Sequence, residues 1–226
     1  MAKLVWDQIG QHFYETGTDH GVVYPKLLEN NRGYGGGVAW NGLTNVSETP
    51  SGGDTTDVYA DNIKYLSIRG KEDIGGTIQA YTYPDEFAVL DGSQEPTAGV
   101  KVYQQMRKAF GFSFRSIIGN DTELNSYGYK LHLIYGMSVS PSEKGYQTVN
   151  DSPEAIQFSW EFKSTPVPVS YVGANGEKYD ATAIITIDST KVDATKLAAL
   201  EEILYGTDTE EARLPLPDEV LQLLAG

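Results

Sequence analysis

Hydrophobic and polar residues alternate with a period of two in several short segments of the chain. Such alternation is typical of β-strands that bury one face and expose the other. Gly, Pro, Asp and Ser are concentrated between these segments, as expected for turns. The pattern predicts roughly six to nine strands. The candidate segments are 21–27, 37–46, 58–69, 76–83, the C-terminal part of 100–116, 130–140, 155–163 and 181–187.

The segment FSWEFKSTPVP at 158–168 has the most aromatic of these alternating patterns. Phe158, Trp160 and Phe162 alternate with polar residues, which predicts a strand with an aromatic buried face. Pro166 and Pro168 follow closely. Proline cannot donate to a central hydrogen-bonded ladder, so the strand is expected either to leave its sheet there or to become an edge strand.

Only one segment has a clear helical period. Asp193 is a suitable N-cap, Leu197, Leu200, Ile203 and Leu204 form an apolar stripe, and Gly206 suits the C-terminal end. A further short helix can begin at Pro217. Strands and helices do not alternate along the chain, so the fold class is predicted to be mainly β, a sandwich or partly closed barrel with one flanking helix near the C-terminus.

The chain is expected to form a single domain over residues 1–226, since no internal repeat or linker divides it. Repeated glycines in residues 1–35 predict an extended N-terminal arm, and residues 207–226 are expected to form a C-terminal tail. Segments 37–46 and 58–69 are predicted to form a hairpin with a long polar loop at its tip. Long loops of this kind tend to be functional. The loop consists of Ser47, Glu48, Thr49, Pro50, Ser51, Gly52, Gly53, Asp54, Thr55, Thr56 and Asp57.

The charge balance restricts the classes of partner. The 226 residues carry 31 acidic and 17 basic side chains, a net charge of −14. Such a surface disfavours nucleic acid as a ligand, because affinity for DNA comes mainly from neutralising phosphates. It is also compatible with a wall past which DNA slides, or with simple solubility. The chain has no cysteine, which fits a reducing compartment, and neither a secretory signal nor a membrane-spanning segment is expected.

Candidate catalytic groups are sparse. His12, His20 and His132 show no metal-ligand spacing, and the glycines of GYGGG at 33–37 precede a strand-like segment rather than a helix. The paired carboxylates are adjacent in sequence, so on a strand they point to opposite faces. The prediction is therefore that the protein is not an enzyme and that it uses no cofactor or metal. An enzyme that draws carboxylates from different strands is the alternative.

One stretch of the chain is basic although the protein as a whole is acidic. Residues 96–120, which end just before Asp121, contain no acidic residue. Residues 201–226, in contrast, contain seven acidic side chains and a single basic one, Arg213. Patches of opposite sign favour head-to-tail self-association. The alternative is that both are solvated faces. The hypothesis places the basic stretch at a subunit interface through Lys101, Gln104, Gln105, Arg107, Lys108 and Arg115.

Several stretches together resemble the major tail protein of long-tailed phages, the subunit of the tail tube. They are YADNIKYLSIRG at 59–70, GGTIQAYTYPDEFAVLDG at 75–92, QQMRKAFGFSFRS at 104–116, GND at 119–121, YGYKLHLIYGMSVSPSEKGYQTVNDSPEA at 127–155, FSWEFKSTPVPV at 158–169 and LEEILYGTDTEEARLPLPDEV at 200–220. The resemblance spans nearly the whole chain. None of these stretches carries chemistry by itself, and their order and joint presence make the resemblance specific.

The resemblance implies a sandwich or half-barrel of tail tube type. Six copies would close into a ring, and stacked rings would form a tube with an acidic lumen through which DNA passes. It implies location in the virion tail after assembly in the host cytoplasm, and as partners the tape measure protein, the tail terminator and baseplate or tail-tip proteins. Within it, the 47–57 loop is expected to mediate ring stacking. Alternatives are another tube or tail-completion protein on the same fold, and a β-sandwich module that binds carbohydrate.

Overall fold

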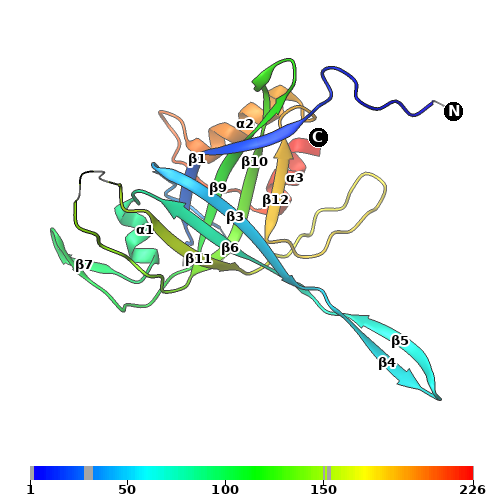
Figure 1. The fold of residues 1–226 in the computed structure, drawn as a ribbon, viewed down its shortest axis with the longest axis horizontal. Helices are drawn as coiled ribbons and strands as arrows, with labels where there is room; N and C mark the ends of the chain where they lie inside the picture. Colours follow the sequence, from blue (N-terminus) through cyan, green and yellow to red (C-terminus); the bar gives the residue numbers. More distant parts are fainter. Residues whose placement is uncertain (1–2, 28–32, 150, 152–153, 226) are drawn as a thin grey trace.

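A computed structural model describes residues 3–27, 33–149, 151 and 154–225. The fold is mainly β and antiparallel, with one large sheet and helices near the C-terminus (Figure 1). The elements are β1 Tyr14–Pro25, β2 Val38–Trp40, β3 Leu43–Gly52, β4 Thr55–Ala60, β5 Ile63–Arg69, β6 Glu72–Ala80, α1 Asp85–Leu90, β7 Gln94–Thr97, β8 Val100–Val102, β9 Phe110–Asn120, β10 Leu124–Val139, β11 Phe158–Ser164, β12 Ile184–Asp188, α2 Ala194–Tyr205 and α3 Pro217–Ala225.

The large sheet has the strand order β2-β1-β9-β10-β11-β6-β3, and β12 also pairs with β10. One edge of the long strand β10 is shared, since β12 pairs along 130–134 and β11 along 137–139. The two ends of this order, β2 and β3, are joined by only Asn41 and Gly42. In addition, a Cβ at Gly21 of β1 would come within 2.1 Å of the Leu43 side chain of β3. The sheet therefore curls until its two ends meet, and the prediction of a mainly β fold is confirmed.

The curled sheet separates two hydrophobic cores. The inner core is rich in aromatic residues, and the rings of Trp40 and Phe87 lie 4.2 Å apart between their centroids. The outer core lies between the opposite face of the sheet and helices α2 and α3, where Leu200 and Leu204 are fully buried. Both faces of the central strands are therefore covered, which explains why β9 is buried or half-buried at every position.

Gly136 lets β10 change the face that it presents. The alternation at 130–140 predicts that one face is shared by Leu131, Leu133, Tyr135, Met137 and Val139. In the structure Leu133 and Tyr135 belong to the outer core, whereas Met137 belongs to the inner core. The register shifts between Ile134 and Met137, and Gly136 has a φ of 59°, a conformation that favours glycine. The prediction of a single face was therefore wrong, because it did not include this bulge.

The aromatic strand β11 lies between β10 and β6. Its buried face consists of Trp160, Phe162 and Ser164, and the strand ends before Pro166. The expectation that the chain leaves the sheet at the prolines is confirmed. The alternative, an edge strand protected by proline, is wrong, because β11 is paired on both sides.

Helix α2 forms as its sequence predicts. The Asp193 side chain accepts hydrogen bonds from the backbone N–H of Thr195 and Lys196 at 3.0 and 3.2 Å, and Gly206 ends the helix with a φ of 78°. Helix α3 begins at Pro217, also as predicted. Helix α1 was not predicted. It has only six residues, too few to show a helical period, although its Phe87 is fully buried.

The prediction of an N-terminal arm over residues 1–35 was wrong. Residues 1–35 do not form one arm, because 14–25 are strand β1, which pairs with β2 and β9 and buries Val23 and Tyr24. The expected C-terminal tail, residues 207–226, contains α3, whose Val220 is buried in the outer core. Residues 1–2 and 28–32 of the expected arm lie outside the described residues.

The segment from Ser47 to Asp57 is not a loop. Residues 43–52 form strand β3, which pairs with β6, and residues 55–60 form strand β4, which pairs with β5. The predicted pairing of 37–46 with 58–69 is therefore wrong. The observed hairpin is formed by β4 and β5. Its turn is Asp61–Asn62, where both residues have positive φ, the conformation of a tight two-residue hairpin turn. The sequence carries this signal in Ala-Asp-Asn-Ile, which interrupts the alternation at 58–69.

Candidate functional site

The β4–β5 hairpin projects from the body of the molecule (Figure 1). At its base, the N–H of Gly53 donates to the carbonyl of Lys71 at 3.0 Å, and the N–H of Gly70 donates to the carbonyl of Asp54 at 2.9 Å. Gly52 and Gly53 both have positive φ, so the regular strand conformation is interrupted where the β3–β6 ladder ends and the β4–β5 ladder begins. The hairpin is thus a separate two-stranded ladder that the large sheet does not support.

One face of this hairpin is apolar. The register places Val58 opposite Leu66 and Thr56 opposite Ile68, so these side chains share a face. Leu66 and Ile68 are 40 and 57% exposed. The other face carries the polar cross-strand pair Asp57–Ser67, whose side chains are hydrogen-bonded at 2.6 Å. Nearer the tip, the apolar side chains of Tyr59, Ile63 and Tyr65 are also exposed. A two-stranded hairpin is marginally stable alone, and an exposed apolar face of this kind marks a contact surface.

The segment 3–13 is the second projection. The carboxylate of Asp121 accepts hydrogen bonds from the N–H of Gly10 at 3.0 Å and of His12 at 3.3 Å, and the Asn120 amide donates to the carbonyl of Gly10 at 3.2 Å. These contacts fix the segment on the β9–β10 turn. Beyond this anchor, the segment extends away from the sheet (Figure 1). Its apolar side chains there are exposed, namely Leu4, Val5, Trp6 and Ile9.

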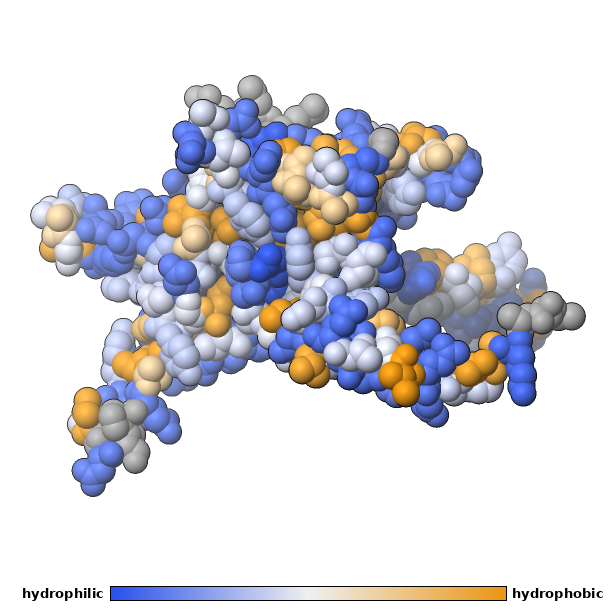
Figure 2. Space-filling view, turned by 90° about the horizontal axis from the view of Figure 1, so that it is seen from above, coloured by the Kyte–Doolittle hydropathy of each residue, from blue (hydrophilic) through white to orange (hydrophobic). Residues whose placement is uncertain are grey.

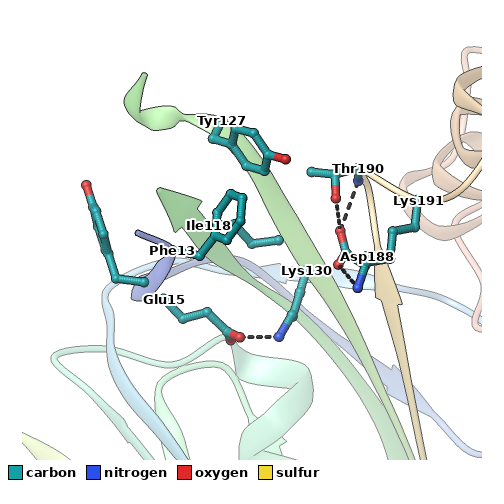
Figure 3. A pocket seen from close by; sticks show the side chains of 9 residues that line it. Phe13, Glu15, Ile118, Tyr127, Lys130, Asp188, Thr190 and Lys191 are labelled. Carbon is teal, nitrogen blue, oxygen red and sulfur yellow. Dashed lines mark hydrogen bonds and ion pairs between the residues drawn. The ribbon is translucent and has the colours of Figure 1, made fainter. Parts of the chain in front are cut away.

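A surface cleft of about 400 Å³ lies beside the root of this segment. Figure 3 shows Phe13, Ile118 and Tyr127 along one side, and the charged groups of Lys130, Asp188 and their partners along the other. The rings of Phe13 and Tyr127 lie 5.0 Å apart between centroids. The remaining lining residues are Tyr14, Glu15, Thr190 and Lys191.

The charges of this cleft are paired within the chain. Lys130 forms an ion pair with Glu15, and Lys191 lies 3.2 Å from Asp188. Burial alone would raise the pKa of Asp188, but hydrogen bonds from Thr190 and Lys191 hold it below its usual value. The Lys191 side chain is 79% exposed, so its ammonium group remains accessible from solvent. The cleft therefore joins an aromatic wall to an accessible cation.

The predicted basic stretch spans two hairpins rather than one strand. Lys101 lies in β8 and Arg115 in β9, while Gln104, Gln105, Arg107 and Lys108 lie between these strands. Three of its cations pair within the chain, since Lys101 contacts Asp85 at 2.6 Å, Arg107 contacts Asp91 at 3.7 Å and Arg115 contacts Asp19 at 3.0 Å. These partners lie outside the basic stretch in the sequence, so the composition of the stretch alone does not indicate them. Two of the three pairs lie at the two ends of α1, at Asp85 and Asp91, whereas the third joins β1 and β9.

Lys108 differs from its neighbours. It is exposed, and it forms no ion pair among the residues that the structure describes. Gln105 donates a hydrogen bond to the backbone carbonyl of Tyr103, while Gln104 has a positive φ. Of the basic stretch, Lys108 is therefore the cation with its charge available for another molecule.

The three histidines lie in unrelated settings. His12 faces Asp121, His20 faces Asp19 and Arg115, and His132 stacks on Phe114 with ring centroids 4.5 Å apart. Burial lowers the pKa of His132. Across residues 3–27, 33–149, 151 and 154–225, no group of three or more His, Cys, Asp or Glu side chains is arranged to hold a metal ion.

None of the described helices is long and apolar enough to cross a bilayer. No protein-family model matches the chain, and no curated protein matches it. Figure 2 shows the outline that results from the features above, with several arms extending from a central body and hydrophobic surface visible on them. The surface features that distinguish this molecule are therefore its projections and the cleft.

Proposed function

We propose that this protein is a structural subunit that assembles with copies of itself, as a tail tube protein of a long-tailed phage. Six copies close into a ring, rings stack into a tube, and genome DNA passes through the lumen. The protein is not an enzyme and uses no metal or cofactor. Its place is the virion tail, assembled in the host cytoplasm, with the tape measure protein, tail terminator and tail-tip proteins as neighbours. The sequence resemblance and the curled antiparallel sheet support this proposal.

The observation that carries the proposal is the β4–β5 hairpin. Its apolar face lies in solvent in the single chain, although burying apolar surface is worth about 25 cal/mol per Å². Covering this face in a second subunit removes the unfavourable exposure of Val58, Leu66 and Ile68. We assign ring stacking to this hairpin. Residues 47–52, which pair with β6, position it, and residues 53–57 begin it.

The experiment is a clean excision of the hairpin. Residues 54–70 are removed and Gly53 is joined to Lys71 through Asn-Gly, because these two residues are already hydrogen-bonded in the structure. Deleting only 50–54 would instead remove residues that pair with β6 and disturb the sheet. The excised protein is expected to fold as a monomer or ring and to form no tubes in negative-stain electron microscopy.

A pair of matched substitutions tests whether stacking depends on the apolar face of the hairpin or only on the presence of the hairpin. Leu66→Lys keeps the hairpin but places a charge on its apolar face, whereas Ser67→Lys places the same charge on the polar face, opposite Asp57. Leu66→Lys is expected to prevent stacking and Ser67→Lys to weaken it far less. Tubes of normal length from the excised protein would refute the stacking role. A wild-type protein that stays monomeric at high concentration would refute the proposed function itself.

The acidic charge of the protein suits the lumen of such a tube. A wall rich in Lys and Arg would hold DNA by neutralising its phosphates, with an affinity that falls as salt rises. With a net charge of −14, assembled tubes are expected to bind duplex DNA more weakly than micromolar even at low salt. Tighter binding, measured by fluorescence anisotropy of a labelled duplex, would contradict passage of DNA without retention.

A further inference from the structure

The segment 3–9 and the cleft beside Phe13 have complementary properties. The segment contains Trp6, whose side chain is 73% exposed, followed directly by the carboxylate of Asp7. The cleft offers an aromatic wall of Phe13 and Tyr127 and, at its rim, the exposed ammonium of Lys191. Its volume of about 400 Å³ falls within the range of about 300–1,000 Å³ found for pockets that hold an organic ligand.

The segment does not occupy the cleft of its own chain. The two backbone N–H groups bonded to Asp121 fix residues 10–12 on the β9–β10 turn, and residues 3–9 leave that anchor away from the sheet (Figure 1). The cleft lies between the first residues of β1, β10 and the end of β12, and none of residues 3–9 lines it. Trp6 is therefore presented to another molecule, and the cleft is left open to one.

We propose that the cleft of one subunit binds the segment 3–9 of a second copy, with the Trp6 indole against Phe13 and Tyr127 and the Asp7 carboxylate beside Lys191. This proposal rests on the proposed function, because it supplies one of the contacts of that assembly. Aromatic rings prefer offset-stacked or edge-to-face arrangements. The rings of Phe13 and Tyr127 are tilted by 49° to each other, so an indole between them can make either kind of contact. The carboxylate adds selectivity through charge.

The contact is heterologous, since the segment and the cleft are different surfaces of one chain. Each subunit donates its own segment to one neighbour and accepts the segment of another, so the same contact can repeat from copy to copy. Such contacts generate closed rings when the rotation closes and filaments when it does not. The β4–β5 hairpin is a separate surface, so the two contacts can be removed independently.

A peptide assay tests the contact without requiring tubes. The probe is a fluorescein-labelled peptide of residues 3–12, and the receptor is the full chain with Trp6→Ala, which disables its own segment. Fluorescence anisotropy is expected to show saturable binding at micromolar concentrations. A peptide with Trp6→Ala is expected to bind at least tenfold more weakly, and a peptide with Asp7→Lys at least threefold more weakly.

Receptor variants locate the site. Tyr127→Ala is expected to weaken peptide binding at least tenfold, with the exposed Tyr146 as the matched control position, and Lys191→Glu at least threefold, with the exposed Lys178 as its control. Circular dichroism spectra and melting temperatures verify that each receptor is folded. Equal binding to the cleft variants and to their controls would overturn the proposal.

Trp6 itself provides a second measurement in the full chain. Trp40 and Trp160 are buried, so among the three tryptophans Trp6 dominates any change of emission on association. Its emission is expected to shift to shorter wavelength as protein concentration rises, and Tyr127→Ala is expected to abolish the shift. A shift that is already complete in dilute monomer would mean that the segment folds back on its own chain, and would overturn the proposal.

The remaining outcomes separate this inference from the proposed function. Peptide binding together with a protein that forms no tubes or rings would contradict the proposed function and support the contact. Normal tubes from Trp6→Ala with no peptide binding would contradict the contact alone. Binding of chitotetraose in the cleft, with no binding of the peptide, would assign the cleft to a carbohydrate and overturn the proposal.

Discussion

Reversing the charge of Arg107 is expected to destabilise the subunit itself rather than only its assembly. Asp91 follows helix α1, and its side chain is only 12% exposed. It contacts Arg107 at 3.7 Å, Lys144 at 3.3 Å and the indole N–H of Trp160 at 3.3 Å. This carboxylate therefore ties together three segments that are far apart in the sequence. Arg107→Glu would place a second carboxylate beside it.

The magnitude follows from the geometry. Two unit charges about 4 Å apart interact by about 4 kcal/mol at an effective dielectric constant of about 20. The Arg107 side chain is 32% exposed, so solvent and rotation of the new side chain relieve part of this repulsion. Lys144 remains to offset a further part. We expect a loss of about 2 kcal/mol in the free energy of unfolding, which for a chain of this size lowers the melting temperature by about 4–8 °C.

The assay compares Arg107→Glu with Lys108→Glu. Both change the charge by the same amount at adjacent positions, but Lys108 is exposed and has no ion pair among the described residues. Circular dichroism melts of the unassembled proteins at low salt are expected to show the loss for Arg107→Glu and a change within about 0.5 kcal/mol for Lys108→Glu. An equal melting temperature for both variants would refute the reasoning. A loss of assembly in Lys108→Glu without a loss of stability would support the interface role of the basic stretch.

Three further changes test other parts of the structure. Gly136→Ala is expected to lower unfolding free energy by about 3 kcal/mol, measured by urea denaturation, because its φ is positive and a Cβ would lie 2.3 Å from the Thr165 carbonyl oxygen; a loss below about 1 kcal/mol would contradict this. Burial raises the pKa of Glu48, so its stability cost appears as pH rises above the ordinary glutamate value; Glu48→Gln is therefore expected to raise the melting temperature at pH 7 but not at pH 4, and a gain at both would contradict the assignment. The backbone hydrogen bond from Gly10 lowers the pKa of Asp121 despite some desolvation, so this anchor is present at neutral pH and lost as pH falls through that pKa; Asp121→Ala is expected to speed proteolysis within residues 3–13 at pH 7, and unchanged cleavage would show that other contacts hold the segment.

The sequence was a good guide where the period and the cap residues agree with the tertiary environment. Helix α2 is the clearest case, because the Asp193 cap, the leucine stripe and Gly206 act locally. Strand β11 is another, since its three aromatic residues need one buried face whichever strands lie beside it. In both cases the local preference and the tertiary packing favour the same conformation.

The sequence failed where a distant partner decides the structure. Residues 47–52 have the composition of a loop, and they become a strand because β6 pairs with them along the whole segment. Backbone pairing does not depend on side-chain polarity, and both faces of β3 are largely exposed there, so polar residues are tolerated. The same limit applies to the basic stretch, where the partners Asp19, Asp85 and Asp91 lie outside it in sequence.

The assembly surfaces show a further limit, because period-two alternation is the same for a buried strand and for an exposed hairpin. The alternation at 58–69 predicted a strand, but it did not show that the apolar face of β4 and β5 lies in solvent. What separates the two cases is the backbone at Gly52, Gly53 and Gly70, which detaches this ladder from the large sheet. The inner core is complete without the hairpin, since none of its residues belongs to either core. Folding of the body therefore does not depend on the hairpin, and under the proposed function a variant of the hairpin is expected to change self-association while it leaves the fold intact.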